Sequence, residues 1–536
     1  MNYVIGSGPA GVAAASALLD QGLSVTMLDA GGELESQTRS TIARLARTAP
    51  DAWCAEDLDT VRGPLRYNTE GAPLKLAFGS DYAYRDVEAL QPVAATRVDA
   101  YRSFAAGGLS VLWGAAVLPY SEGDLEGWPL SVADMAEHYV AALGMTGLAA
   151  EHDALARIYP LYIQPTARLD LSAQARAIAD RMAQYADDLA EQQFHVGRAR
   201  LAVSPPPGTS QGCVHCGMCL YGCPHGLIYS ARATLQARLD AFPRAFTYQP
   251  GIVVRRLTES RGTVTINAVE RHTLRPRQFE AARVYLGAGV LASTAILLES
   301  LEAYSQSVLL MQSDHFLLPL LLRASAGSAS SEHLHTLSQL FIEVLNPSVS
   351  RHSVHLQLYT YNDFYARMAK DKLGRFYAIA APVIERLIDR TVLLKGYLHS
   401  AESAGITAVL DRDSAGSILR LDARMPERSN RSINALTAII RKHGRHMGVL
   451  PIPLGFRKGL PGSGVHVGGS FPMRHNPHGY EADLLGRPVG FTRVHVVDAT
   501  VFPTIPAAPP TLTIMANAHR IASLSHKGVE DTACSG

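Results

Sequence analysis

The sequence predicts a protein of mixed α/β and α+β class that contains both a parallel and an antiparallel sheet. At the N-terminus, an apolar strand over residues 3–5 leads through a glycine turn into helix formers over 12–21 and a second strand over 24–28. Strand, helix and strand in this order form a βαβ unit, whose strands are parallel. Residues 333–345 and 351–362 alternate roughly in polarity and are rich in β-branched and aromatic types, which indicates an antiparallel sheet.

Length and composition are those of an ordinary globular protein. The chain has 536 residues, of which 47% are hydrophobic and 18% are charged. Such a chain is too long for one simple core, so we expect two or three domains, which can be interleaved in the sequence. The formal net charge of +1 gives no reason to expect binding to nucleic acid or to an anionic membrane.

We expect no targeting or membrane-spanning segment. Tyr3–Ile5 runs directly into glycines, without the basic region and cleavage site of a signal peptide. The longest apolar stretch, residues 284–298, is interrupted by glycine and is shorter than the roughly 20 residues that a spanning helix needs. The sequence therefore predicts a cytoplasmic protein, in which thiols stay reduced.

The N-terminal βαβ unit carries a nucleotide-binding motif. Gly6, Gly8 and Gly11 have the spacing G-x-G-x-x-G of Rossmann-type domains, and Asp29 stands at the end of the second strand. The first glycine permits the tight turn, the second lets the backbone approach a pyrophosphate, and the third lets helix and strand pack closely. The helix N-terminus faces the phosphate, and the acid can accept hydrogen bonds from a ribose. The full context favours a nucleotide site over a glycine turn without a ligand, but it does not separate FAD from NAD.

Three later segments resemble the glucose–methanol–choline (GMC) family of flavin oxidoreductases. Residues 103–139 resemble the family's second flavin-binding segment, and residues 282–300 resemble its strand, glycine turn and helix. Residues 464–475 and 486–522 are similar to its closing segment. For the cofactor site, the resemblance implies the residues at matching positions, which are Gly107, Gly108, Ser110, Trp113, Asp498 and Thr511. His466 and Pro503 also stand at matching positions.

The resemblance implies FAD as the cofactor and an interleaved architecture. A Rossmann-type FAD-binding domain would be assembled from residues 1–150, 201–325 and 456–536, interleaved with an antiparallel-sheet substrate domain of residues 326–455. Residues 151–200 would form a helical connection. The family likeness places Asp498 near the ribityl or phosphate part of the flavin, and the competing interpretation is a buried aspartate that caps a helix.

The resemblance also identifies a catalytic histidine, His466. In this family a histidine beside the flavin takes the hydroxyl proton of an alcohol while hydride goes to flavin N5, and a neutral imidazole suits that task. The alternative is a hydrogen-bonded structural histidine. The family's second histidine or asparagine is replaced here by Pro509, whose side chain cannot form a hydrogen bond. Candidates for its role elsewhere in the chain are Asn517, His519, His475, His478 and His399.

Four cysteines share one short segment of the chain. Cys213, Cys216, Cys219 and Cys223 have the spacing C-x2-C-x2-C-x3-C of bacterial ferredoxins and are followed by proline. This spacing predicts an iron–sulfur cluster, [4Fe–4S] or [3Fe–4S]. Without a second run, Cys223 or the remote Cys54 would complete the cluster, or three cysteines would hold it. The alternatives are a structural zinc and a metal-free loop.

Together these features predict an FAD-dependent dehydrogenase that oxidises a CH–OH group of an alcohol, polyol or sugar. Hydride would pass to the flavin, and an iron–sulfur cluster would relay electrons to an external acceptor. The alternative is a GMC-type alcohol oxidase that uses oxygen and has a structural or vestigial cysteine loop. A third hypothesis is a flavin-binding protein without alcohol chemistry, suggested by the proline at position 509.

Overall fold

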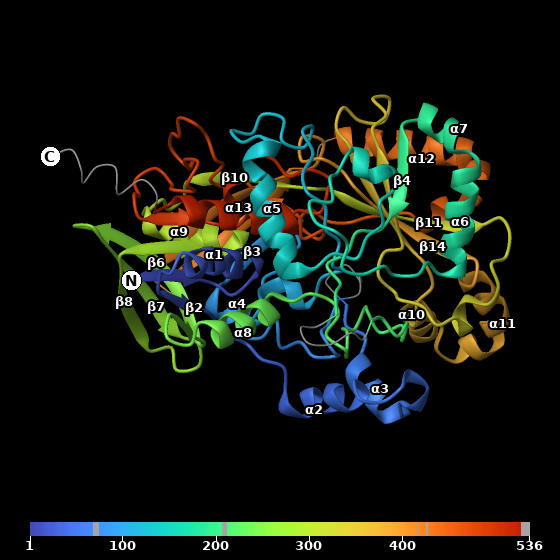
Figure 1. The fold of residues 1–536 in the computed structure, drawn as a ribbon, viewed down its shortest axis with the longest axis horizontal. Coiled ribbons are helices and arrows are strands. Elements are labelled where there is room, and N and C mark those ends of the chain that lie inside the picture. Colours follow the sequence, from blue (N-terminus) through green and yellow to red (C-terminus); the bar gives the residue numbers. More distant parts are fainter. Residues whose placement is uncertain (68–73, 206–211, 415, 425–426, 527–536) are drawn as a thin grey trace.

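The computed structural model describes residues 1–67, 74–205, 212–414, 416–424 and 427–526. It shows two lobes, each built around a sheet (Figure 1). The predicted mixed α/β and α+β class is confirmed, since one large sheet is parallel and the other is antiparallel.

The first lobe contains a parallel five-stranded sheet that combines segments from across the chain. Its strand order is β20-β9-β1-β2-β5, and every neighbouring pair is parallel. The strands are β20 (Val494–Val496), β9 (Arg283–Leu286), β1 (Asn2–Ile5), β2 (Val25–Leu28) and β5 (Phe246–Gln249). All residues of β1 and β2 are buried, as continuous apolar strands in a covered parallel sheet should be.

Helices pack closely in this lobe because small residues line their contacts. The alanine-rich α1 (Pro9–Asp20) buries ten of its twelve residues and packs against α13 (Thr511–Leu524), which in turn packs against α5 (Val132–Thr146). The lobe also contains α8 (Ala231–Ala241) and α9 (Val290–Ser300). The N-terminal and C-terminal parts of the chain therefore share one hydrophobic core.

The second lobe contains a seven-stranded antiparallel sheet of order β17-β11-β14-β13-β12-β4, with β18 pairing on β11. The strands are β17 (Val449–Pro451), β11 (His315–Leu322), β14 (Thr391–Tyr397), β13 (Val354–Tyr359), β12 (Leu340–Val344), β4 (Phe194–Arg198) and β18 (Arg457–Lys458). The pairing of β12 with β13 confirms the antiparallel sheet expected there. The sheet extends beyond residues 326–455, because β4, β11 and β18 belong to it.

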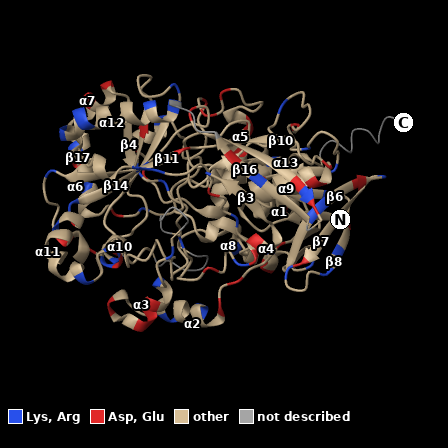
Figure 2. Ribbon diagram, turned by 180° about the vertical axis from the view of Figure 1, so that it is seen from behind, with Lys and Arg blue, Asp and Glu red and all other residues tan. Residues whose placement is uncertain are grey.

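Helices α12 (Glu427–Met447), α6 (Ala173–Gln184) and α7 (Ala186–Glu191) pack together at this lobe and contribute to its core. Further helices are α2 (Ser36–Leu45), α3 (Ala55–Arg62), α4 (Val87–Leu90), α10 (Asp363–Leu373) and α11 (Tyr377–Ile388). In the described part of the chain, no helix is both long and apolar enough to cross a membrane. Acidic and basic residues are interspersed over the outer elements of both lobes (Figure 2).

Two further sheets, one of five and one of three strands, complete the fold. The first has the order β19-β10-β15-β16-β3, and the second is the antiparallel β6-β7-β8. Their strands are β19 (Val467–Gly468), β10 (Ser307–Gln312), β15 (Gly405–Asp413), β16 (Gly416–Arg424), β3 (Val93–Thr96), β6 (Ile252–Ser260), β7 (Thr263–Glu270) and β8 (Pro276–Ala281). Strand β19 begins directly after His466, so its pairing with β10 fixes the position of that histidine.

Candidate active site

One large cavity connects the parallel sheet with the antiparallel sheet. Its volume is about 1640 Å³, well above the range of about 300–1,000 Å³ that is usual for a single small ligand. Gly8 and Asp29 line one end, and His466, Lys395 and Tyr359 line the other. The cavity therefore has room for a dinucleotide and a second molecule.

The glycine turn after β1 forms an open cradle at the first end. A Cβ on Gly11 would meet the Gly6 carbonyl oxygen at 1.9 Å, and a Cβ on Gly6 would meet the Gly287 oxygen at 2.5 Å, so both glycines allow close backbone packing. A Cβ on Gly8 would meet only the Gly108 Cα, at 3.9 Å. A Cβ on Gly108 would meet the Gly8 Cα at 3.1 Å, so the two glycines lie side by side in the cavity wall, where a ligand can approach the bare backbone.

Asp29 ties this turn to the second glycine segment. Its carboxylate accepts hydrogen bonds from the Ser7 amide (3.1 Å), the Ser7 hydroxyl (2.8 Å), the Gly31 amide (3.0 Å) and the Tyr248 hydroxyl (2.9 Å). The Ser7 hydroxyl also accepts from the Gly107 amide at 2.9 Å. Four donors occupy most of the acceptor capacity of a carboxylate, so Asp29 holds the cradle, and its ribose contact remains a prediction.

The second glycine segment places two predicted residues differently. Ser110 is buried and holds the backbone, donating to the Gly107 oxygen at 2.6 Å and accepting from the Ala231 amide at 2.9 Å. Trp113 lines the cavity and donates from Nε1 to the Tyr229 oxygen at 2.7 Å. Ser110 thus shapes the turn, and both Ser110 and Trp113 line the cavity.

Asp498 and Thr511 lie where other loops approach the cradle, and both line the cavity. The Asp498 carboxylate accepts from the Gly289 amide (2.9 Å), the Ser293 hydroxyl (2.6 Å) and the Thr500 amide (3.0 Å). It therefore caps the start of α9, in agreement with the competing interpretation. Thr511 is the first residue of α13, so a helix N-terminus also faces the cavity.

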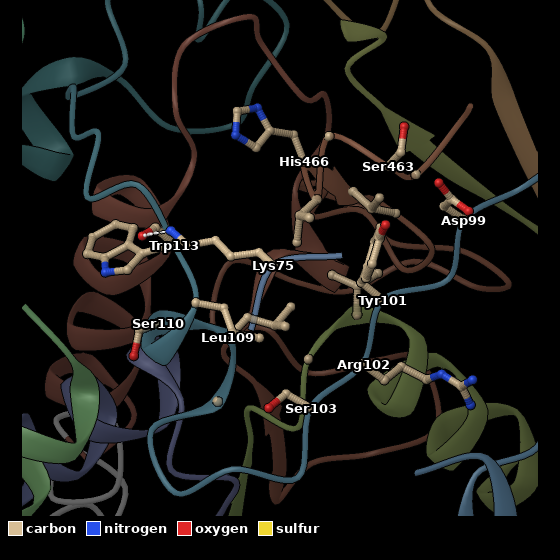
Figure 3. A pocket seen from close by; sticks show the side chains of 18 of the residues that line it. Lys75, Asp99, Tyr101, Arg102, Ser103, Leu109, Ser110, Trp113, Ser463 and His466 are labelled. Atoms are coloured by element: carbon tan, nitrogen blue, oxygen red, sulfur yellow. Dashed lines mark hydrogen bonds between the residues drawn. The ribbon is translucent and has the colours of Figure 1, made fainter. Parts of the chain in front are cut away.

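His466 lies at the other end of the cavity (Figure 3). Val465 before it has φ of 60°, a conformation that is rare for a β-branched residue, and turns the chain into the cavity. The ring stacks on Tyr397 with centroids 4.5 Å apart, and its Nδ1 has no hydrogen-bond partner among the described residues. Burial, with the nearby charge of Lys395 and the imidazoles of His355 and His315, holds the pKa of His466 well below its usual value. The imidazole is therefore neutral and can accept a proton.

Pro509 lies on the cavity wall with His466, so the structure places no side-chain donor at that position. None of the five residues that the sequence suggested as replacements is among the described lining residues. Asn517 bonds Arg520, His519 faces His138, and His399 stacks on His352.

The structure instead brings a polar chain from β12 and β13 to the cavity. Buried Glu343 pairs with His355, His355 contacts the Gln357 amide at 3.0 Å, and the Tyr359 hydroxyl donates to the Gln357 oxygen at 2.8 Å. Gln357 and Tyr359 line the cavity. The alternation of β13 places His355, Gln357 and Tyr359 on one face, which is the only signal of this chain in the sequence.

Two lysines that the sequence did not single out also line this end. Lys395 lies on β14 two residues before Tyr397, with Nζ 5.1 Å from the centroid of the Tyr397 ring. Lys75 donates to the Trp113 carbonyl oxygen at 2.9 Å. Burial, together with repulsion from Lys395, lowers the pKa of Lys75 to about 8, whereas Cys219 opposes the shift. Burial also lowers the pKa of Lys395, against the opposing effect of Tyr359.

The C-terminal part of the cavity wall matches the model of a known protein family. Residues 456–518 match the GMC oxidoreductase family. This segment contains His466, Asp498, Pro509 and Thr511. No curated protein sequence matches the chain significantly.

Solved structures of oxidases share this fold over almost the whole chain. Pyridoxine 4-oxidase from Mesorbium loti has a TM-score of 0.59 and 15% identity, covering 98% of this chain and 99% of that one. Formate oxidase from Aspergillus oryzae RIB40 has a TM-score of 0.61 and 12% identity, covering 99% and 98%. A second formate oxidase structure has the same values. At these identities the likeness shows the shared fold, and with the family match it supports the GMC resemblance.

The four cysteines are the residues for which the sequence predicted an iron–sulfur cluster. No three histidine, cysteine, aspartate or glutamate side chains of the described residues form a group that could hold a metal ion, and Cys54 is exposed. The Sγ atoms of Cys213 and Cys219 accept from the amides of His215 and Thr336 at 3.4 Å. Burial raises the pKa of Cys216 to about 11 and of Cys219 to about 12, which favours protonated thiols. Among the described residues, the structure thus gives no support to the predicted iron–sulfur cluster or to the alternative zinc site.

Proposed function

We propose that this protein is an FAD-dependent oxidoreductase of the GMC family that oxidises a CH–OH group. The observation that carries this proposal is the cavity, which joins the open Gly8–Gly108 cradle to the neutral imidazole of His466. The family match over residues 456–518 and the shared fold support it.

The residues at the cradle fit FAD. The bare backbone of Gly8 and Gly108 and the N-terminus of α1 would hold the pyrophosphate, and the N-terminus of α13 at Thr511 would face another polar part of the cofactor. Asp29 and Asp498 would keep these segments in place through their amide hydrogen bonds. Trp113 would contact the flavin ring.

When bound, FAD supplies the hydride acceptor, so the alcohol carbon loses a hydride as its hydroxyl loses a proton. His466 would take that proton, since its imidazole is neutral and its Nδ1 has no partner among the described residues. Tyr397 would fix the ring by stacking, and the Tyr359 hydroxyl and Gln357 would orient the substrate. With proline at position 509, these side chains would supply the second polar contact.

We further propose oxygen as the electron acceptor, with hydrogen peroxide as the second product. The solved structures of the same fold carry the names of oxidases, which supports this choice over a dehydrogenase. The predicted iron–sulfur relay to an external acceptor is left out, since the cysteine loop offers no ligand group in the described residues.

The test compares the purified protein with His466→Ala. Without oxygen, the flavin bands of the native protein should bleach when a reactive alcohol from a panel is added, and the variant should bleach about 10²- to 10⁴-fold more slowly. His495→Ala is the control, because His495 is buried beside Tyr285 outside the cavity. Equal bleaching rates in the native protein and His466→Ala would refute the assignment. With oxygen, peroxide equal to product would identify an oxidase, and reduction of a dye without peroxide would identify a dehydrogenase.

A further inference from the structure

We propose that the cavity beside His466 contains a subsite for an anionic group of the substrate, such as a carboxylate, formed by Lys395 and Lys75. This inference rests on the proposed function and names its substrate class: an alcohol that carries a negative charge at a second position. Two observations lead to it, the location of these two ammonium groups and the engagement of the carboxylates around them.

Both lysines belong to the His466 end of the cavity. Lys395 and Tyr397 occupy alternate positions of β14, so both side chains project from the same face of the sheet. Lys395, His466, His315 and Lys75 all line this cavity, and burial together with the charge of Lys395 lowers the pKa of the other three. Lys75 extends toward Trp113 in the part of the cavity below His466 (Figure 3).

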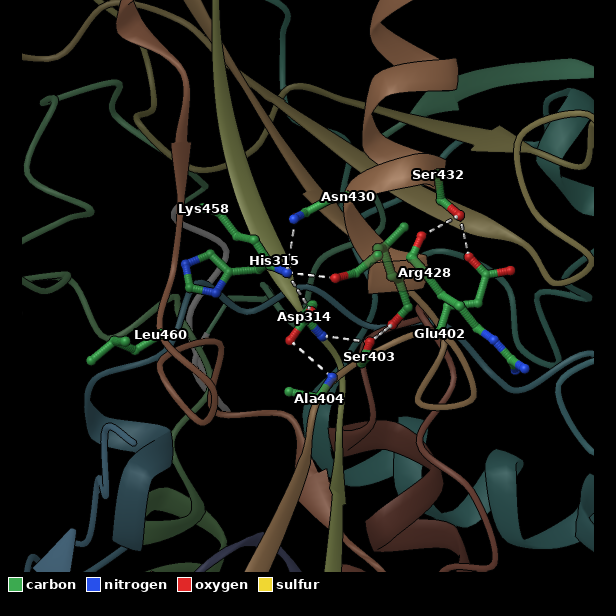
Figure 4. A network of polar contacts seen from close by, with 12 residues as sticks. Asp314, His315, Glu402, Ser403, Ala404, Arg428, Asn430, Ser432, Lys458 and Leu460 are labelled. Carbon is green, nitrogen blue, oxygen red and sulfur yellow. Dashed lines mark hydrogen bonds and ion pairs between the residues drawn. The ribbon is translucent and has the colours of Figure 1, made fainter. Parts of the chain in front are cut away.

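Neither lysine forms an ion pair within the described parts of the chain. The nearby Lys458, in contrast, forms an ion pair with a carboxylate of the protein. Its Nζ lies 3.0 Å from an Asp314 carboxylate oxygen and 3.4 Å from the Asn430 side-chain oxygen (Figure 4). Lys458 is thus compensated from within the fold, whereas the partners found for Lys395 and Lys75 are a tyrosine ring and one carbonyl oxygen.

The described carboxylates that line the cavity are all engaged elsewhere. Asp29 and Asp498 bind amides and hydroxyls at the cradle. Asp371 accepts a hydrogen bond from the Tyr67 hydroxyl at 2.8 Å. Asp99 lies beside Ser463 and Tyr101, away from the Lys75 ammonium (Figure 3). No acid of the described lining therefore balances the two cations.

An anion bound here would relieve an unfavourable arrangement. Desolvating an ammonium group is costly unless a counter-charge accompanies it, and two close cations add repulsion. A carboxylate between Lys395 and Lys75 would accept charge-assisted hydrogen bonds from both. It would also offset the effect of Lys395 on His466 and so raise the proton affinity of that base when substrate is bound. The subsite would thus couple recognition to catalysis.

The experiment uses two alcohols that differ only in charge, 4-(hydroxymethyl)benzoate and 4-(hydroxymethyl)benzamide. Their kcat/KM values are measured by anaerobic flavin bleaching in the native protein, Lys395→Met, Lys75→Met and the exposed control Lys442→Met. We expect a preference for the carboxylate of about tenfold or more, equal to about 1.4 kcal/mol. Lys395→Met should lose most of it, Lys75→Met part of it, and Lys442→Met none.

Binding of benzoate and of benzamide, measured by calorimetry, gives a readout that does not depend on turnover. Benzoate should bind more tightly to the native protein, and Lys395→Met should remove that difference. Equal binding of the two, or a benzoate preference that survives both lysine variants, would overturn the subsite. A shifted flavin reduction potential in Lys395→Met with an unchanged benzoate preference would also overturn it. If benzoate binds selectively but no alcohol bleaches the flavin, the subsite stands and the proposed function falls.

Discussion

The two ends of the cavity differ in whether their charged side chains have partners within the protein. At the cradle, the carboxylates of Asp29 and Asp498 receive four and three hydrogen bonds from the protein, and both serve to hold backbone segments. At the His466 end, Lys75 and Lys395 have no carboxylate partner in the described residues. Under the proposed function, the first end would support the cofactor with its hydrogen bonds already formed, whereas the second end lacks a counter-charge, which the substrate would bring.

The largest expected effect is on the unfolding free energy, which should fall when Lys458 is replaced but not when Lys395 is replaced. Lys458→Met would leave the buried Asp314 carboxylate without its cation, and breaking such a pair costs about 3–5 kcal/mol of unfolding free energy. Lys395→Met, in contrast, should leave the unfolding free energy unchanged or raise it, because it removes a cation with no counter-charge. Urea unfolding of the two variants measures both values. A Lys395→Met variant as unstable as Lys458→Met would show that Lys395 has a structural partner.

The second prediction concerns a larger side chain at the glycine cradle. Gly8→Val would place methyl groups on the cavity wall beside Gly108, where a Cβ on Gly8 meets no protein atom closer than 3.9 Å. Because Gly8 has φ of −66°, the backbone accepts the substitution without strain. Flavin affinity should fall by about tenfold or more, or about 1.4 kcal/mol, while the unfolding transition of the flavin-free protein hardly changes.

Flavin content per protein, from absorbance after gel filtration, measures this effect. Gly144→Val is the matched control, since Gly144 is exposed on α5 and a Cβ there meets nothing within 4 Å. A Gly8→Val protein that keeps its flavin would place the cofactor elsewhere.

The third prediction concerns pH. Burial, with repulsion from Lys395, lowers the pKa of Lys75 to about 8 against the opposing effect of Cys219. Lys75 is therefore charged below about pH 8 and neutral above it, so its attraction for an anion is lost as the pH rises. Because kcat/KM reports the free enzyme, its value for the hydroxymethyl benzoate should fall above pH 8 relative to its value for the benzamide, by the same part of the preference that Lys75→Met removes. A ratio of the two values that stays constant from acidic to alkaline pH would contradict this role.

The smallest effect belongs to the polar chain at the substrate end. Tyr359→Phe removes the hydroxyl that donates to Gln357 at 2.8 Å, and a single hydrogen bond is worth about 0.5–1.5 kcal/mol. We expect kcat/KM to fall by about 2- to 10-fold, with flavin content unchanged. Tyr229→Phe, a buried tyrosine that bonds Thr234 behind the cradle, serves as the control. A loss of flavin in Tyr359→Phe would move this residue to the cofactor end.

The sequence predicted the cradle better than the substrate end for a physical reason. One βαβ unit contains Gly6, Gly8, Gly11 and Asp29, and local spacing along the chain determines its geometry. In the same way, β12 and β13 pair as neighbouring segments of the chain. Lys395, by contrast, reaches His466 only because β14 pairs with both β11 and β13. Local sequence patterns do not show which distant strands pair, so the sequence did not predict that Lys395 lines the cavity with His466.

The cysteine loop shows the opposite case, in which a local pattern predicted a metal site that the described residues do not support. Spacing places Cys213, Cys216, Cys219 and Cys223 close along the chain, but a ligand set also needs side chains that converge. Gly217 and Gly222 have positive φ, and a Cβ on Gly222 would meet the Phe78 ring at 2.5 Å. Gly222 thus allows the loop to pack against Phe78, which fits the metal-free alternative.

The most direct test of the central claim is the visible absorption spectrum of protein purified without oxygen, recorded before and after addition of the hydroxymethyl benzoate. We predict flavin bands without a broad brown absorption, which bleach when the alcohol is added and return when air is admitted. A colourless protein that takes up no added FAD would contradict the proposed function. Flavin bands on a broad brown absorption that reductant bleaches would restore the iron–sulfur relay and contradict the choice of oxygen as sole acceptor.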